Sequence, residues 1–97
     1  MRIDVSKFGD SLVSRSSGRE AALALQANML RGIVPSESID LDFSGVLVLT
    51  PSWADEFFSV LRQQQVGKQI HILPSQNSTV QLTLETIGEI ADSPSNS

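Results

Sequence analysis

The chain contains no cysteine, no tyrosine and a single tryptophan among its 97 residues. The absence of cysteine excludes a disulfide scaffold and thiolate zinc sites. Basic residues are also few, with seven lysines and arginines against eleven acidic residues and a formal net charge of −4. Because binding to nucleic acid or to anionic lipid depends on clustered positive charge, we expect neither partner.

Long hydrophobic runs are missing as well. Met1 to Asp4 begins directly in an alternating pattern without an apolar signal-peptide core, and no run is long enough to span a membrane. We therefore expect a cytoplasmic protein. The length suits one domain, which we place at residues 1–91, and the polar residues 92–97 are expected to form a disordered tail.

Signatures of catalysis and of metal binding are absent too. The sequence shows no glycine-rich phosphate loop, no serine or cysteine nucleophile with a visible base, and no metal-ligand spacing. His71 lies between two isoleucines and is expected to be an ordinary sheet residue. Asp40 and Asp42 share one side of a strand, but two carboxylates make a weak cation site. We expect no enzymatic activity, no cofactor and no metal.

The most informative stretch is Ile39–Phe58, which predicts a strand, a short connection and a helix. Apolar residues alternate with Asp40 and Asp42, which favours a strand over residues 38–43. The helix has two candidate starts: Thr50 followed by Pro51, or Ser52 with Asp55 three residues later. At 100° per residue its apolar side chains form one stripe that would lie on a sheet: Trp53, Ala54, Phe57, Phe58, Val60 and Leu61.

The residues before this stretch predict a hairpin and a helix. Ile3 and Val5 alternate with polar residues, and a turn at Gly9-Asp10 leads to the apolar pair Leu12-Val13, which is typical of a β-hairpin. Ser17 with Glu20 fits a capping box. The helix that follows is expected to run to about Arg31 and to end at Gly32 and Pro35.

The last third of the chain carries two competing patterns. After a turn at Gly67-Lys68, residues 69–73 predict a short strand. Residues 79–85 alternate as a strand would, whereas Ser78 with Gln81 forms another capping box ahead of a helical stripe through Val80, Leu84, Ile87 and Ala91. We predict a helix here, because the stripe extends beyond the alternating part.

These motifs together resemble a known family. The run LDFSGV at Leu41–Val46, the helix beginning at Thr50 and the segment ILPSQNSTVQLTLETIG look like a STAS domain, the fold of bacterial anti-sigma factor antagonists. Ala54–Phe57 and the upstream Ser14–Ser16 resemble more closely the STAS-like family of unestablished function. The likeness covers Ser14 to Gly88. With the patterns above, it leads us to expect an α/β fold with a small, mostly parallel mixed sheet, an N-terminal hairpin and about three helices.

The resemblance also implies a role. STAS antagonists are regulatory modules that dock on a partner protein, such as an ATPase-type kinase of the anti-sigma kind. Aligning on LDFSGV puts Pro51 at the position of the family's phosphorylated serine, which leaves Ser52 and Thr50 as the phosphoacceptor candidates here. We expect the partner to contact this part of the chain, with five residues as the candidate docking set: Thr50, Ser52, Trp53, Asp55 and Glu56.

Three further features have two interpretations each. Ser14, Arg15 and Ser16 could hold an anion at a helix start, or could serve as a cap and a surface salt bridge. Trp53 could be core or an interface anchor. The first helix has a stripe at Ala22, Leu25 and Met29 and a nearly opposite one at Leu23, Ala27 and Leu30. The second stripe is either wrapped by the domain or is an association surface, for a homodimer or another protein.

We therefore expect a non-catalytic regulatory interaction module. Two functions of other classes stay open. A small-ligand or nucleotide sensor would have its pocket near residues 34–37 and 50–53, where strands end and helices begin. A non-catalytic subunit of an enzyme would complete an active site that belongs to its partner.

Overall fold

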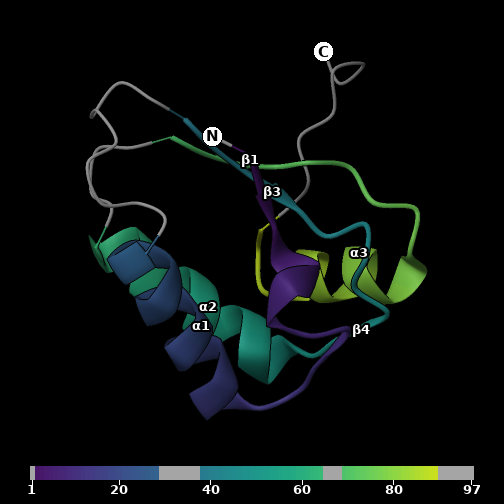
Figure 1. The fold of residues 1–97 in the computed structure, drawn as a ribbon. Helices are drawn as coiled ribbons and strands as arrows, with labels where there is room; N and C mark the ends of the chain where they lie inside the picture. Colours follow the sequence, from purple (N-terminus) through teal and green to yellow (C-terminus); the bar gives the residue numbers. More distant parts are fainter. Residues whose placement is uncertain (1, 29–37, 65–68, 90–97) are drawn as a thin grey trace.

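The part of the chain that the structure describes contains three α-helices and five short strands, with α1 and α2 each lying between strands (Figure 1). The structure is a computed structural model, which describes residues 2–28, 38–64 and 69–89. The order of elements is β1 (Arg2–Asp4), the 3-10 helix η1 (Val5–Phe8), β2 (Ser11–Leu12), α1 (Arg15–Asn28), β3 (Ile39–Asp42), β4 (Val48–Leu49), α2 (Pro51–Gln64), β5 (Ile70–Ile72) and α3 (Ser78–Thr86). No helix in these ranges is long and apolar enough to cross a membrane.

The strands form two small sheets. One has the order β1-β3-β5, with Ile3 beside Leu41 and Leu41 beside Ile72, and the other pairs β2 with β4. Every strand pair in the described ranges is parallel, as helices between strands require. The expected α/β fold with three helices and mostly parallel strands is confirmed.

The expected N-terminal hairpin is wrong. The side chain of Asp4 accepts a hydrogen bond from the amide of Ser6 at 3.1 Å and caps η1, so the chain turns away directly after β1. Leu12 then pairs beside Leu49 of β4 instead of returning along β1. β4 itself was not predicted, because two residues are too few to show an alternating pattern.

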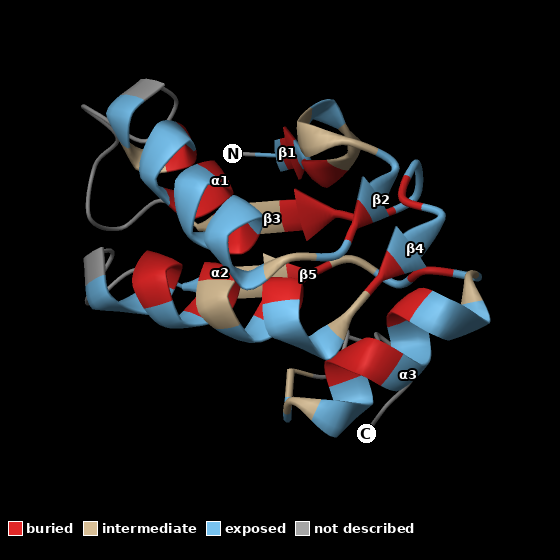
Figure 2. Cartoon of the chain, turned by 90° about the horizontal axis from the view of Figure 1, so that it is seen from below, coloured by how far each residue is buried: buried red, intermediate tan, exposed pale blue. Residues whose placement is uncertain are grey.

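The helices lie on one side of the three-stranded sheet, with α1 and α2 side by side (Figures 1 and 2). Strand residues that face the helices, such as Ile3, Leu41 and Ile72, are at most 3% exposed. Between them, Arg2 and Asp4 are exposed and point to the other face. Parallel sheets are usually covered on both faces, so the alternation of apolar and polar residues explains why this one works with a single helical layer.

All five aromatic side chains of the protein form one cluster at the buried face of α2, with four of them buried and Phe8 half-buried. Trp53 stacks on Phe57 with ring centroids 4.7 Å apart, and Phe57 meets Phe58 edge to face at 5.4 Å. Phe43 and Phe8 extend the cluster at 6.3 and 6.4 Å. The whole predicted apolar stripe of α2 is buried, which confirms that this helix lies on the sheet.

The helix starts differ from two of the predicted caps. Ser14, not Ser17, caps α1, because its hydroxyl accepts from the amide of Ser17 at 3.2 Å. α2 uses the first of its two candidates, Thr50, whose hydroxyl accepts from the amide of Trp53 at 3.4 Å. α3 is a helix as predicted, and its cap is Asn77.

Several predictions fall outside the described residues. They concern the end of the first helix near Arg31, its stop at Gly32 and Pro35, the turn at Gly67-Lys68, and the tail at 92–97.

Candidate partner-docking site

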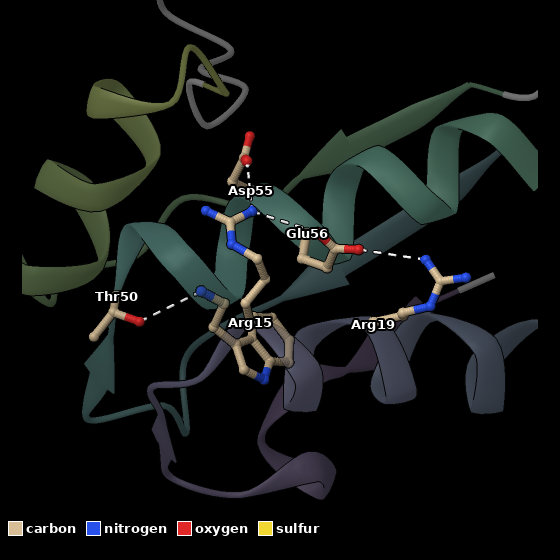
Figure 3. Close-up of polar contacts among 6 residues, drawn as sticks. Arg15, Arg19, Thr50, Asp55 and Glu56 are labelled. Atoms are coloured by element: carbon tan, nitrogen blue, oxygen red, sulfur yellow. Dashed lines mark hydrogen bonds and ion pairs between the residues drawn. The ribbon is translucent and has the colours of Figure 1, made fainter.

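The start of α2 is fixed to β2 by Thr50. The Thr50 amide and hydroxyl both donate to the carbonyl oxygen of Leu12, at 3.0 and 3.2 Å, while the hydroxyl also accepts from the amide of Trp53 (Figure 3). The Thr50 hydroxyl therefore both donates and accepts a hydrogen bond, and it positions the start of α2 against β2. Ser52, one residue beyond Pro51, is exposed.

Trp53 is core and not part of an exposed rim. It is 1% exposed and stacked on Phe57, and Gly18 of α1 covers its backbone. The alternative of a half-exposed interface anchor is wrong for this residue. Helical periodicity put Trp53 at the edge of the apolar stripe, but could not show that a second helix closes over it.

Asp55 and Glu56 join α2 to α1 through ion pairs (Figure 3). Arg15 lies 3.0 Å from the Asp55 carboxylate and 3.3 Å from that of Glu56, and Arg19 lies 3.4 Å from the other Glu56 oxygen. Hydrogen bonds to Asp55 and then to Glu56 raise the pKa of Arg15 above its usual value. Exposed pairs of this kind contribute little to stability, so their main effect is to set the charge pattern of this surface.

The segment Ser14–Ser16 provides a helix cap and a surface salt bridge, which is the second of its two interpretations. Ser14 caps α1 and Arg15 is ion-paired, while Ser16 is exposed on the first turn. An anion at this position would have to compete with Asp55 and Glu56 for Arg15.

Three exposed aliphatic side chains next to this helix start were not predicted as site residues. Leu47 is 61% exposed, Val13 55% and Val48 40%, and we call this set the β2–β4 face. Ser11 pairs beside Val48, while Leu12 and Leu49 point into the core. Successive side chains of a strand alternate, so Val13 lies on the same side as Ser11 and Val48. Leu47 precedes β4, and its amide shares the Asp10 carbonyl oxygen with the amide of Val48, so it stands outside this alternation. The apolar runs Leu12-Val13 and Leu47–Leu49 are the sequence features that could have indicated it.

The two stripes of α1 have different surroundings. Ala22 and Leu25 are at most 1% exposed, whereas Leu23 is 37% exposed and Ala27 is exposed as well. The first stripe is core. The remaining members, Met29 and Leu30, lie outside the described residues.

The polar face of the three-stranded sheet contains one buried carboxylate, that of Asp42. The Arg2 guanidinium donates a hydrogen bond to the Asp42 carboxylate at 2.6 Å, and the Ser44 amide donates another at 2.9 Å. These bonds, of which the one from Arg2 has the larger effect, hold the pKa of Asp42 below its usual range. His71 faces the Gln69 amide oxygen at 3.3 Å. Within the described ranges, no three histidine, aspartate or glutamate side chains gather as metal ligands would.

The chain matches the model of a known protein family. A family model described as a STAS-like domain of unknown function (DUF4325) covers residues 26–80, which include β3, β4, α2 and β5. No curated protein and no solved structure matches the chain.

Proposed function

The chain belongs to the family of STAS-like domains of unknown function, and from this premise we propose that it is a non-catalytic regulatory module that docks on a partner protein. The observation that carries the proposal is the β2–β4 face. Leu47 and Val48 expose large aliphatic side chains directly before the start of α2, and Val13 exposes one directly after β2, the strand that pairs with β4. Exposed apolar side chains that cluster beside a polar rim are typical of protein interfaces.

The polar rim of this surface comes from the predicted docking set. Ser52 and Asp55 are exposed on the first turns of α2, and Asp55 with Glu56 forms the ion pairs to Arg15. Such an arrangement suits an interface with an apolar centre and charged surroundings. A partner of the ATPase-type, anti-sigma-like kinase class fits the family resemblance.

Phosphorylation is not required in this proposal. Pro51 stands where STAS antagonists carry their phosphorylated serine, and the Thr50 hydroxyl is engaged with Leu12 and Trp53. A phosphate on Ser52 would gain from the helix N-terminus but would lie three residues from the Asp55 carboxylate. We therefore expect Ser52→Ala and Ser52→Asp to bind the partner about as well as the wild type. Loss of binding in Ser52→Asp alone would support a phosphate switch instead.

The central experiment compares two exposed leucines. Proteins captured by the wild-type chain are purified and titrated against wild type, Leu47→Asp and Leu82→Asp. Leu82 is 66% exposed on α3 and serves as the matched control. We expect Leu47→Asp to weaken binding at least tenfold and Leu82→Asp to leave it unchanged. Equal binding by all three chains would contradict docking through the β2–β4 face.

The proposed absence of enzymatic activity has its own test. Screening of the purified chain for hydrolase, transferase and nucleotide-hydrolysis activity should return background. Turnover that disappears on changing His71, Asp42 or Asp55 would overturn it.

A further inference from the structure

A hollow of about 290 Å³ lies between β2 and α1. Its apolar wall is formed by Phe8, Leu12, Val13, Ala21, Ala24 and Trp53. Pockets for drug-sized ligands and cofactors measure roughly 300–1,000 Å³. At the lower end of that range, this hollow suits a single large apolar side chain.

One edge of β2 adjoins the hollow and has no neighbouring strand in the described residues. The amides of Val48 and Thr50 on the β4 side donate to the carbonyl oxygens of Asp10 and Leu12, each at 3.0 Å. Alternate residues of a strand direct their backbone groups to opposite sides, so those of Ser11 and Val13 face away from β4. An edge of this kind accepts a further strand.

Glu20 gives the hollow a negative charge. It lines the hollow from α1 and makes no ion pair with any described residue. The two arginines of the same helix, Arg15 and Arg19, bind Asp55 and Glu56 instead. With a net charge of −4 for the whole chain, the hollow favours a ligand with positive charge close to its apolar group.

We propose that the hollow and the β2 edge together bind an extended segment of the partner protein. The segment adds to β2 as a strand through the backbone of Ser11 and Val13, places one large apolar side chain in the hollow, and sets a lysine or arginine against Glu20. Recognition by strand addition obtains affinity from main-chain hydrogen bonds and specificity from pockets for alternate side chains. The inference rests on the proposed docking function and names the chemistry of the segment.

The test starts from a random-sequence peptide library displayed on phage and selected on the whole purified chain. We expect enrichment of peptides in which a large apolar residue lies within two positions of a lysine or arginine. Ala24 is exposed and lines the hollow, so Ala24→Leu should fill it without unfolding the chain and should weaken a selected peptide at least tenfold. Glu20→Lys should change the selected charge to acidic, and Leu82→Asp should have no effect.

Strand addition is tested separately from filling of the hollow. Methylation of the peptide amides that face β2 should weaken binding at least tenfold, and bound peptide should slow hydrogen exchange at the amides of Ser11 and Val13. Peptides that bind equally well after methylation, or a selection in which wild type and Ala24→Leu enrich the same sequences, would overturn the inference. Leu47→Asp distinguishes the two proposals, because it should weaken the whole partner but not the isolated peptide. Partner binding that depends on Leu47, without any selected peptide, would overturn this inference alone.

Discussion

Gly18 of α1 lies directly against the backbone carbonyl of Trp53 on α2, and a β-carbon at position 18 would be 2.3 Å from that oxygen. The two helices therefore touch backbone to backbone at their first turns. The ion pairs of Arg15 and Arg19 with α2 lie at the same end. This contact sets how closely the first turns of α1 and α2 approach, and so it fixes the exposed Ser52 and Asp55 relative to α1.

Gly18→Ala should destabilise the domain. Alanine in a helix interior is ordinarily favoured over glycine by about 1 kcal/mol, but the added methyl group would overlap the Trp53 carbonyl. Overpacking of this kind costs about 1–3 kcal/mol. Urea unfolding measures the change, with the exposed Ser16→Ala on the same helix as control. A Gly18→Ala chain more stable than the wild type by about 1 kcal/mol, as helix propensity alone would give, would contradict the close contact between α1 and α2.

Trp53→Ala should lower the stability of the whole domain, because Trp53 lies in the core and not on a binding surface. Removing a large buried aromatic side chain costs about 3–5 kcal/mol, and Trp53 stacks on Phe57 at the centre of the aromatic cluster. Because it is the only tryptophan, its fluorescence reports on it directly. We expect blue-shifted emission and protection from acrylamide in the native chain. Emission typical of water would contradict the buried position.

The helices were the most predictable part of the fold. The apolar stripe of α2 spans several turns, and its periodicity identified every buried residue from Trp53 to Leu61. The same periodicity argument predicts α3 as a helix, because its apolar stripe continues to Ile87, beyond the short segment that alternates like a strand. Strands β3 and β5 were found because β3 alternates cleanly and β5 is bounded by Pro74.

The short elements and the site could not be predicted in the same way. β2 and β4 have two residues each, so only tertiary pairing distinguishes them from loops. Two caps were misplaced because serine and asparagine occur at several adjacent positions, and the choice depends on backbone geometry. The sequence does not predict the β2–β4 face, because Leu47 and Val48 are exposed only as a result of the tertiary pairing of Leu12 with Leu49.

Asn77→Ala should destabilise the domain, whereas Ser78→Ala should not. The side-chain Oδ1 of Asn77 accepts from the amides of Thr79 and Val80, and its side-chain Nδ2 donates to the carbonyl oxygens of Val46 and Leu47. Loss of a cap costs about 0.5–2 kcal/mol, and the lost bonds to the β3–β4 connection add to that. Thermal unfolding of the two variants compares the observed cap with the cap that the sequence pattern predicted. Equal losses would favour the capping box at Ser78.

Asp42 should make stability depend on pH in acid. Because Arg2 and the Ser44 amide lower its pKa in the folded chain, its contribution is complete above the unfolded pKa of about 4 and is lost as the pH falls through the lower, folded value. Asp42→Asn and Arg2→Met should both make the decline of stability below about pH 4 less steep. Urea unfolding at a series of pH values tests this. An acid decline identical to that of the wild type in both variants would contradict the role of the pair.

The exposed stripe of α1 should tolerate a charge that the buried stripe does not. Leu23 is 37% exposed and Leu25 is fully buried on the same helix, so the same substitution can be made at both. Leu23→Glu should change the free energy of unfolding by no more than about 0.5 kcal/mol, as surface substitutions usually do, while Leu25→Glu buries an unpaired carboxylate and should unfold the chain. If Leu23 and Ala27 form an association surface, Leu23→Glu should also reduce self-association in sedimentation velocity experiments over a range of concentrations. A wild-type chain that stays monomeric throughout would remove the homodimer. Unfolding by Leu23→Glu would show instead that this stripe is covered by the domain itself.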